Sequence, residues 1–228
     1  REDGPQAHLA KEGTPTMGGV LIVLSALIGF LAWAQKLQGG TGFALGLALI
    51  GGGLLGFADD YTKLHYARSL GLKGRTKLLW QLALSVALAY LATQHFGVDT
   101  KLYWFRSDAV ICDLGPLYYL LVFIMIIGAS NAVNLTDGLD GLASGATVLV
   151  MTAYILITFT QFRNHQYLYT HVQGSLDIAI FCGALLGSCV GFLWWNSPPA
   201  YIFMGDTGSL ALGCSLATVA ILTGLRAT

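Results

Sequence analysis

The sequence predicts an all-α integral membrane protein in which several helices cross the bilayer and form one bundle. Hydrophobic residues make up 55% of the 228 positions and charged residues only 11%, whereas a soluble domain contains roughly 25% charged residues. The long uncharged runs are continuous and do not alternate with polar residues, as the strands of a membrane barrel do. This composition excludes a cytosolic enzyme, a disordered tail and, because the net charge is zero, a basic protein that binds nucleic acid.

Seven uncharged stretches are each long enough, at about 20 residues, to cross a hydrocarbon core of ~30 Å as a helix. No repeat, low-complexity run or linker separates them, so residues 1–228 are predicted to form a single transmembrane domain. Small-xxx-small spacings such as Gly52/Gly56 and Gly183/Gly187 favour close packing of helices within one subunit, with a homodimer interface as the alternative. In chain order, the expected spans are Met17–Gln35, Thr41–Ala58, Leu78–Gly97, Leu114–Leu135, Gly141–Phe162, Ile178–Trp195 and Ser209–Leu225.

Positive charge is distributed unequally between the two sides of the predicted bundle. One side receives the N-terminal segment and the connections near 59–77, 131–145 and 196–208, and it holds seven Lys and Arg residues against five on the other. Five of these seven lie within residues 59–77. The positive-inside rule therefore predicts that this side faces the cytoplasm.

Acidic and amide side chains gather at the ends of the spans on the same cytoplasmic side. A carboxylate near membrane depth is costly, and such residues are functional candidates by default. Two unit charges about 4 Å apart repel by roughly 4 kcal/mol at an effective dielectric of 20, so converging carboxylates need a cation among them. Mg²⁺ fits best because it binds through one or two carboxylates together with phosphates and waters. The candidates are Asp59, Asp60, Asn131, Asn134, Asp137, Asp140 and Asp206.

Spacing gives a second reason to expect a polar ligand here. Asn131, Asn134 and Asp137 follow one another at steps of three, which places them on one helical face, and Gly138 and Gly141 let a ligand approach the backbone. The alternative is that these side chains are only solvated at the membrane interface. Basic residues on this side either donate to phosphate groups or contact anionic headgroups: Lys11, Lys63, Lys73, Arg75 and Lys77.

Four blocks of sequence carry a resemblance to a known family. They are KEGTPTMGG at residues 11–19, FADDYTK at 57–63, NAVNLTDGLDGLA at 131–143 and FMGDTGS at 203–209. In this order, and over nearly the whole chain, they resemble the phospho-N-acetylmuramoyl-pentapeptide transferases (the MraY family) of the polyprenyl-phosphate N-acetylhexosamine-1-phosphate transferase superfamily. The thirteen-residue third block and the TPTMGG segment are the specific part of the match.

The resemblance implies a Mg²⁺-dependent enzyme of the bacterial cytoplasmic (inner) membrane, with its active site facing the cytoplasm. Such an enzyme transfers phospho-MurNAc-pentapeptide from UDP-MurNAc-pentapeptide to undecaprenyl phosphate, and it forms lipid I and UMP in peptidoglycan synthesis. Nucleoside inhibitors are further expected ligands. The nearest alternative is a related polyprenyl-phosphate GlcNAc-1-phosphate transferase. A transporter with a carboxylate relay is less favoured, because the polar residues gather at one face and not at mid-span.

The resemblance also implies roles for individual residues. The position matching Asp206 binds Mg²⁺, the one matching Asp59 activates or positions the lipid phosphate, and the one matching Asp60 is needed for activity, so these three are the expected catalytic residues. Other matching positions surround the substrates: Lys11, Thr16, Lys63, Lys77, Asn134, Asp137, Gly138, Leu139, Asp140, Asn196, Phe203 and Gly205.

The chain departs from the family pattern at both ends. Members carry about ten spans and a His-rich cytoplasmic loop near the C-terminus, whereas this chain has seven expected spans and no such loop. We therefore expect one helix before Arg1 and about two after Thr228 in the native protein.

Overall fold

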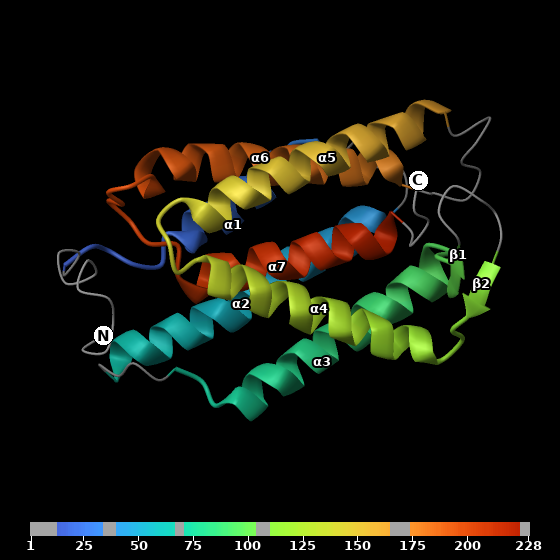
Figure 1. The fold of residues 1–228 in the computed structure, drawn as a ribbon, viewed down its shortest axis with the longest axis horizontal. Coiled ribbons are helices and arrows are strands. Elements are labelled where there is room, and N and C mark those ends of the chain that lie inside the picture. The colour runs from blue at the N-terminus through green and yellow to red at the C-terminus, as the bar shows by residue number, and fades with distance from the viewer. Residues whose placement is uncertain (1–12, 34–39, 67–70, 104–109, 165–173, 224–228) are drawn as a thin grey trace.

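The computed structural model describes residues 13–33, 40–66, 71–103, 110–164 and 174–223. Within them the chain forms a bundle of α-helices and one short hairpin (Figure 1). The prediction of an all-α, multi-pass membrane protein is confirmed. The elements are α1 (Gly19–Leu31), α2 (Thr41–His65), α3 (Gly74–Tyr90), η3 (Leu91–His95), β1 (Lys101–Tyr103), β2 (Val110–Asp113), α4 (Leu117–Thr136), α5 (Leu142–Asn164), α6 (Ser175–Asn196) and α7 (Gly205–Leu222).

Six of the described helices are long and apolar enough to cross a membrane: α2, α3 with its continuation η3, α4, α5, α6 and α7. The first expected span is described only in part, and its helix begins at Gly19, two residues after the predicted start at Met17. Its described part, α1, has 13 residues, which corresponds to about 20 Å of helix, and the end of the predicted span lies in residues 34–39, outside the described part of the chain. The ten helices of the complete protein stay a prediction.

The second span continues beyond its predicted end at Ala58. Helix α2 runs to His65 and carries both aspartates of the second sequence block. Asp59 and Lys63 form an ion pair one turn apart, with Nζ and Oδ2 separated by 2.7 Å. Because the charges neutralise each other along the helix, they do not end it.

Helix α7 is the central helix of the bundle, with 78% of its membrane-length window buried. It packs against α1, α2 and α4, and glycines at these contacts bring the backbones together. A Cβ at Gly52 on α2 would lie 2.8 Å from the carbonyl oxygen of Leu210, and one at Gly56 would collide with the backbone of Asp206. The Gly52/Gly56 spacing therefore packs two helices of the same subunit, as predicted.

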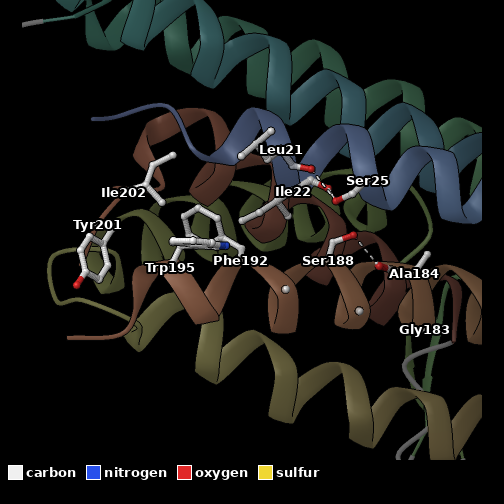
Figure 2. A pocket seen from close by; sticks show the side chains of 12 residues that line it. Leu21, Ile22, Ser25, Gly183, Ala184, Ser188, Phe192, Trp195, Tyr201 and Ile202 are labelled. Carbon is white, nitrogen blue, oxygen red and sulfur yellow. Dashed lines mark hydrogen bonds between the residues drawn. The ribbon is translucent and has the colours of Figure 1, made fainter. Parts of the chain in front are cut away.

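The Gly183/Gly187 spacing does not bring two helices of the subunit into close contact, which corrects the prediction for it, and this glycine stripe borders open space. A Cβ at Gly183, Gly187 or Gly191 of α6 would have no neighbour within 4 Å. These glycines line an apolar groove of about 750 Å³ between α1 and α6, shown in Figure 2, with Trp195 and Tyr201 at one end.

The hairpin lies at one end of the bundle, opposite the end at which α2, α4 and α6 finish (Figure 1). Its strands are antiparallel, and Lys101 pairs with Asp113 and Leu102 with Cys112. At the other end of the bundle, α7 begins beside the last turns of α2 and α4, which brings the candidate functional residues together.

Candidate active site

Three carboxylates from two helices form the centre of the candidate site. Asp59 and Asp60 lie on the sixth turn of α2, and Asp206 is the second residue of α7. Each aspartate offers one carboxylate oxygen to the cluster, and these three oxygens all lie within 4.8 Å of one another. Asp59 is fully buried and Asp60 is 5% exposed, so the cluster lies within the protein, and the predicted convergence of these residues is observed.

Two lysines neutralise part of this negative charge. Lys63 Nζ lies 2.7 Å from Asp59 Oδ2 and 3.0 Å from Asp206 Oδ2. Lys77, from the first turns of α3, reaches the same pair, with its Nζ 2.9 Å from Asp59 Oδ1 and 3.1 Å from Asp206 Oδ2. Both ammonium groups therefore occupy the region between Asp59 and Asp206.

Neutral donors fix the orientation of the two carboxylates. Asn134 Nδ2 on α4 donates to Asp206 Oδ1 at 2.9 Å and to Ser209 Oγ at 2.8 Å. The backbone N–H of Leu72 donates to Asp59 Oδ1 at 2.7 Å. Gly71 lies directly against the Asp59 carboxylate, where a Cβ would have no room. Each carboxylate is thus held by both an amide donor and the two lysines.

The donor set of this cluster fits a hard divalent cation such as Mg²⁺. Mg²⁺ in proteins is held by one or two carboxylates and completes its octahedron with waters and substrate oxygens. Asp59 and Asp206 supply carboxylate oxygens to a common region that already attracts two ammonium groups. The three aspartates and two lysines carry a formal charge of about −1 when all are ionised, so a divalent ion together with an anionic phosphate is electrostatically acceptable there.

The residues that follow α4 line a second part of the site. Asp137 is the C-cap residue of α4, and its carboxylate accepts a hydrogen bond from the backbone of Gly205. Burial, with added repulsion from the carboxylates of Asp206, Asp60 and Asp140, raises the pKa of Asp137 to about 7. Asp137 therefore titrates near neutral pH.

A pocket of about 600 Å³ adjoins this region. It is lined by Leu139 and Asp140 together with residues from the end of α6, and Leu139 is 62% exposed. Gly138 is exposed beside them. Asp140 Oδ2 accepts a hydrogen bond from the backbone N–H of Ala200 at 3.2 Å, so this carboxylate also holds the loop after α6.

The first and fourth sequence blocks are hydrogen-bonded to each other. The N–H of Gly18 donates to the carbonyl of Phe203 at 2.8 Å, and the N–H of Phe203 donates to the carbonyl of Pro15 at 2.8 Å. Thr16 lies exposed between them, and Phe203 is half-buried. The predicted residues Thr16 and Phe203 are therefore neighbours at the start of α7, whereas Lys11 lies outside the described residues.

Asn196 is 3% exposed and joins the loop after α6 to the start of α5. Its Oδ1 accepts hydrogen bonds from the Gly141 N–H at 3.0 Å and the Ser144 hydroxyl at 3.2 Å, and its Nδ2 donates to the Ile202 carbonyl at 2.9 Å. In this structure the side chain orders the backbone beside Phe203.

Sequence reasoning missed several residues that organise this site. Thr207 and Ser209 contact Asp60 and Asn134, and their only signal was their place in the DTGS block. Gln81 and Ser130 had no signal in the sequence. Gln81 Nε2 donates a hydrogen bond to Ser130 Oγ at 2.8 Å. Gln81 lies one turn from Lys77 on α3, and Ser130 lies one turn from Asn134 on α4. This buried bond holds together the two helices that bring those side chains to Asp206.

Comparisons with known proteins place the chain in a family. Residues 41–224 match the model of glycosyl transferase family 4, and residues 11–23 match signature 1 of the phospho-N-acetylmuramoyl-pentapeptide-transferases. Over 98% of its length the chain is 45% identical to the phospho-N-acetylmuramoyl-pentapeptide-transferase of Frankia casuarinae, of which it covers 67%. It is 44% identical to that of Desulfotalea psychrophila over 97% of the chain and 62% of the relative. For that of a Geobacillus species, the identity is 45% over 99% of the chain and 66% of the relative. The chain thus spans about two thirds of the length of these curated relatives.

Proposed function

Because the chain belongs to the phospho-N-acetylmuramoyl-pentapeptide-transferases of glycosyl transferase family 4, we propose that it carries out the transfer named for them. The reaction moves phospho-MurNAc-pentapeptide from its UDP-linked precursor to undecaprenyl phosphate. The products are lipid I and UMP. The observation that best supports this proposal is the cluster in which two lysines and two aspartates from three helices share one region.

Phosphoryl transfer requires neutralisation of charge and in-line positioning more than unusual side chains. Lys63 and Lys77 are suited to bind the diphosphate of the donor, since each carries three N–H donors that can exchange a carboxylate for a phosphate oxygen. Asp206 would hold Mg²⁺, with Asp59 as a neighbouring carboxylate. When bound, Mg²⁺ supplies charge stabilisation to the diphosphate and to the departing UMP.

Asp59 is suited to orient the lipid phosphate or to take a proton from it. Direct attack by the lipid phosphate is favoured over a covalent intermediate on Asp59, because that phosphate is already an anionic nucleophile near neutral pH. The carboxylate of Asp59 is fully buried and held by Lys63, Lys77 and the Leu72 amide. Such contacts stabilise the carboxylate and reduce its nucleophilicity.

The donor's uridine is proposed to occupy the region of Asp137, Gly138, Leu139 and Phe203, beside the 600 Å³ pocket. Nucleoside inhibitors would compete there. The site is proposed to face the cytoplasm of a bacterial cell at the inner membrane. Lys63 and Lys77 of the cluster belong to residues 59–77, and the excess of Lys and Arg in that stretch supports this orientation.

The direct test is release of UMP by the purified chain in nanodiscs. With UDP-MurNAc-pentapeptide, undecaprenyl phosphate and Mg²⁺, we expect UMP and lipid I. If UMP is released only when UDP-GlcNAc replaces UDP-MurNAc-pentapeptide as the donor, the chain is assigned to the related GlcNAc-1-phosphate transfer. Asp59→Asn should lose turnover and keep its affinity for the UDP-sugar. If that affinity is lost as well, Asp59 belongs to the donor site and not to the acceptor site.

A further inference from the structure

The N-terminus of α7 is capped by a side chain from another helix. The N-cap residue Met204 provides no side-chain hydrogen bond, although the first amides of any helix lack partners within it. Asp60 of α2 fills this role. Its Oδ1 accepts the N–H of Asp206 at 3.2 Å, and its Oδ2 accepts both the N–H and the hydroxyl of Thr207 at 2.8 Å.

We propose that Asp60 is a positioning residue, which caps α7 and thereby sets the orientation of Asp206, and that it is not a ligand of the divalent cation. A helix cap fixes the direction in which the first turn projects its side chains. Here the capped amide belongs to Asp206 itself. Loss of the cap would therefore act on the carboxylate of Asp206 through its own backbone.

The positions of the lysines separate Asp60 from the cation region. Lys63 Nζ lies 2.7 Å and 3.0 Å from the carboxylates of Asp59 and Asp206 but 3.8 Å from that of Asp60. Lys77 is likewise ion-paired with Asp59 and Asp206. Positive charge thus collects between Asp59 and Asp206, while the oxygens of Asp60 are directed at the start of α7.

The backbone at the start of α7 is shaped for this contact. Gly205 has a φ of +75°, a conformation that disfavours any residue with a Cβ. A Cβ at this position would also lie 2.7 Å from Asp60 Oδ2. The glycine of the GDTGS sequence therefore leaves room for the Asp60 carboxylate to reach the amides of the next two residues.

Amide hydrogen exchange of the chain in nanodiscs tests the inference. In Asp60→Asn the side-chain amide would face the N–H of Asp206, donor against donor, so exchange of the Asp206 and Thr207 amides should become about fivefold faster, a factor that corresponds to the ~1 kcal/mol typical of a helix cap. Asp206→Asn keeps the cap and should leave these amides protected. Affinity for Mn²⁺, used as a paramagnetic substitute for Mg²⁺, should fall much less in Asp60→Asn than in Asp206→Asn.

A second pair of variants covers the case in which Asp60→Asn does not fold. Thr207→Val removes one of the three bonds and should accelerate exchange of the same amides and slow turnover, whereas Thr207→Ser keeps the hydroxyl and should restore both. Unchanged exchange in Asp60→Asn or Thr207→Val, or a loss of Mn²⁺ affinity in Asp60→Asn as large as in Asp206→Asn, would overturn the proposal. Only the effect on turnover rests on the proposed function, so a chain without transferase activity would still give a decisive exchange result.

Discussion

Replacing Lys77 by methionine is expected to tighten the binding of a divalent metal ion while it lowers turnover. The ammonium group of Lys77 lies 2.9 Å from Asp59 Oδ1 and 3.1 Å from Asp206 Oδ2. It therefore competes with a cation for the same two carboxylates. Methionine keeps much of the length and apolar character of the lysine stem and removes the charge.

The expected change in metal affinity is worked out from these distances. A Mg²⁺ ion lies about 2 Å from a carboxylate oxygen, so an ion on Asp206 Oδ2 would lie no more than about 5 Å from Lys77 Nζ. At that separation a divalent ion and an ammonium group repel by ~6 kcal/mol at an effective dielectric of 20. Because Lys77 is 27% exposed and can swing toward solvent, most of this repulsion is relieved, and we expect a residual effect of ~1.4 kcal/mol, or about tenfold in affinity.

The assay is a titration with Mn²⁺ followed by electron paramagnetic resonance, with the chain in nanodiscs and no substrate. The matched control is Lys73→Met, which removes the same charge from the exposed N-cap position of α3, one turn away. Lys77→Met should bind Mn²⁺ about tenfold more tightly than the wild type, and Lys73→Met should not. UMP release should fall in Lys77→Met because the diphosphate loses a donor. Wild-type or weaker affinity for Mn²⁺ in Lys77→Met would refute the competition argument.

Three further changes test other parts of the site. Asp206→Asn should lower Mn²⁺ affinity and abolish UMP release, while Asp113→Asn on the distant hairpin changes neither; undiminished UMP release at low Mg²⁺ would remove Asp206 from the metal site. The pKa of Asp137 in the folded protein is about 7, against ~3.9 when unfolded, so its ionisation destabilises the fold as pH rises through that interval. Without divalent metal, the melting temperature of the wild type should therefore fall more between pH 5 and pH 8 than that of Asp137→Asn, and parallel curves would contradict the raised pKa. Gly19→Ala puts a methyl group against the backbone of Gly208 and should lower stability by roughly 1–3 kcal/mol in thermal unfolding, whereas Gly46→Ala, with open space around its Cβ, should not.

Hydropathy predicted where the helices lie, but it could not locate the end of a helix whose last turns contain charged residues. A hydrophobicity pattern ends a span at the first charged residues, which placed the end of the second span at Ala58. The helix continues to His65 because Asp59 and Lys63 pair within it. The hairpin was missed for a related reason: its strands have three and four residues, too few for a periodic signal, and they lie between two long apolar helices.

The site was predictable as a set of residues but not as a set of contacts. Because few residues are charged, each polar side chain stood out in the sequence. Successive spans place their connections on alternating sides of the membrane, and this alternation put the polar residues at one end of the bundle. The hydrogen bond between Asp60 and Thr207 joins positions 147 residues apart, and no local sequence pattern predicts it. Asp60 and Asp59 are adjacent in the chain and look equivalent in sequence, yet one faces the helix amides of α7 and the other faces the lysines.

The position of α7 explains why the two adjacent aspartates can differ in this way. Successive residues on a helix point about 100° apart, so the side chains of Asp59 and Asp60 project in different directions. Because α7 is buried and packs directly on α2 through Gly52 and Gly56, one of the two directions meets the α7 N-terminus, where the helix dipole favours a carboxylate. The other meets Lys63, Lys77 and the second carboxylate of the cluster. The close packing of α2 on α7 thus gives the two adjacent aspartates different roles. Asp60 orders the backbone at the start of α7, and Asp59 is available for chemistry.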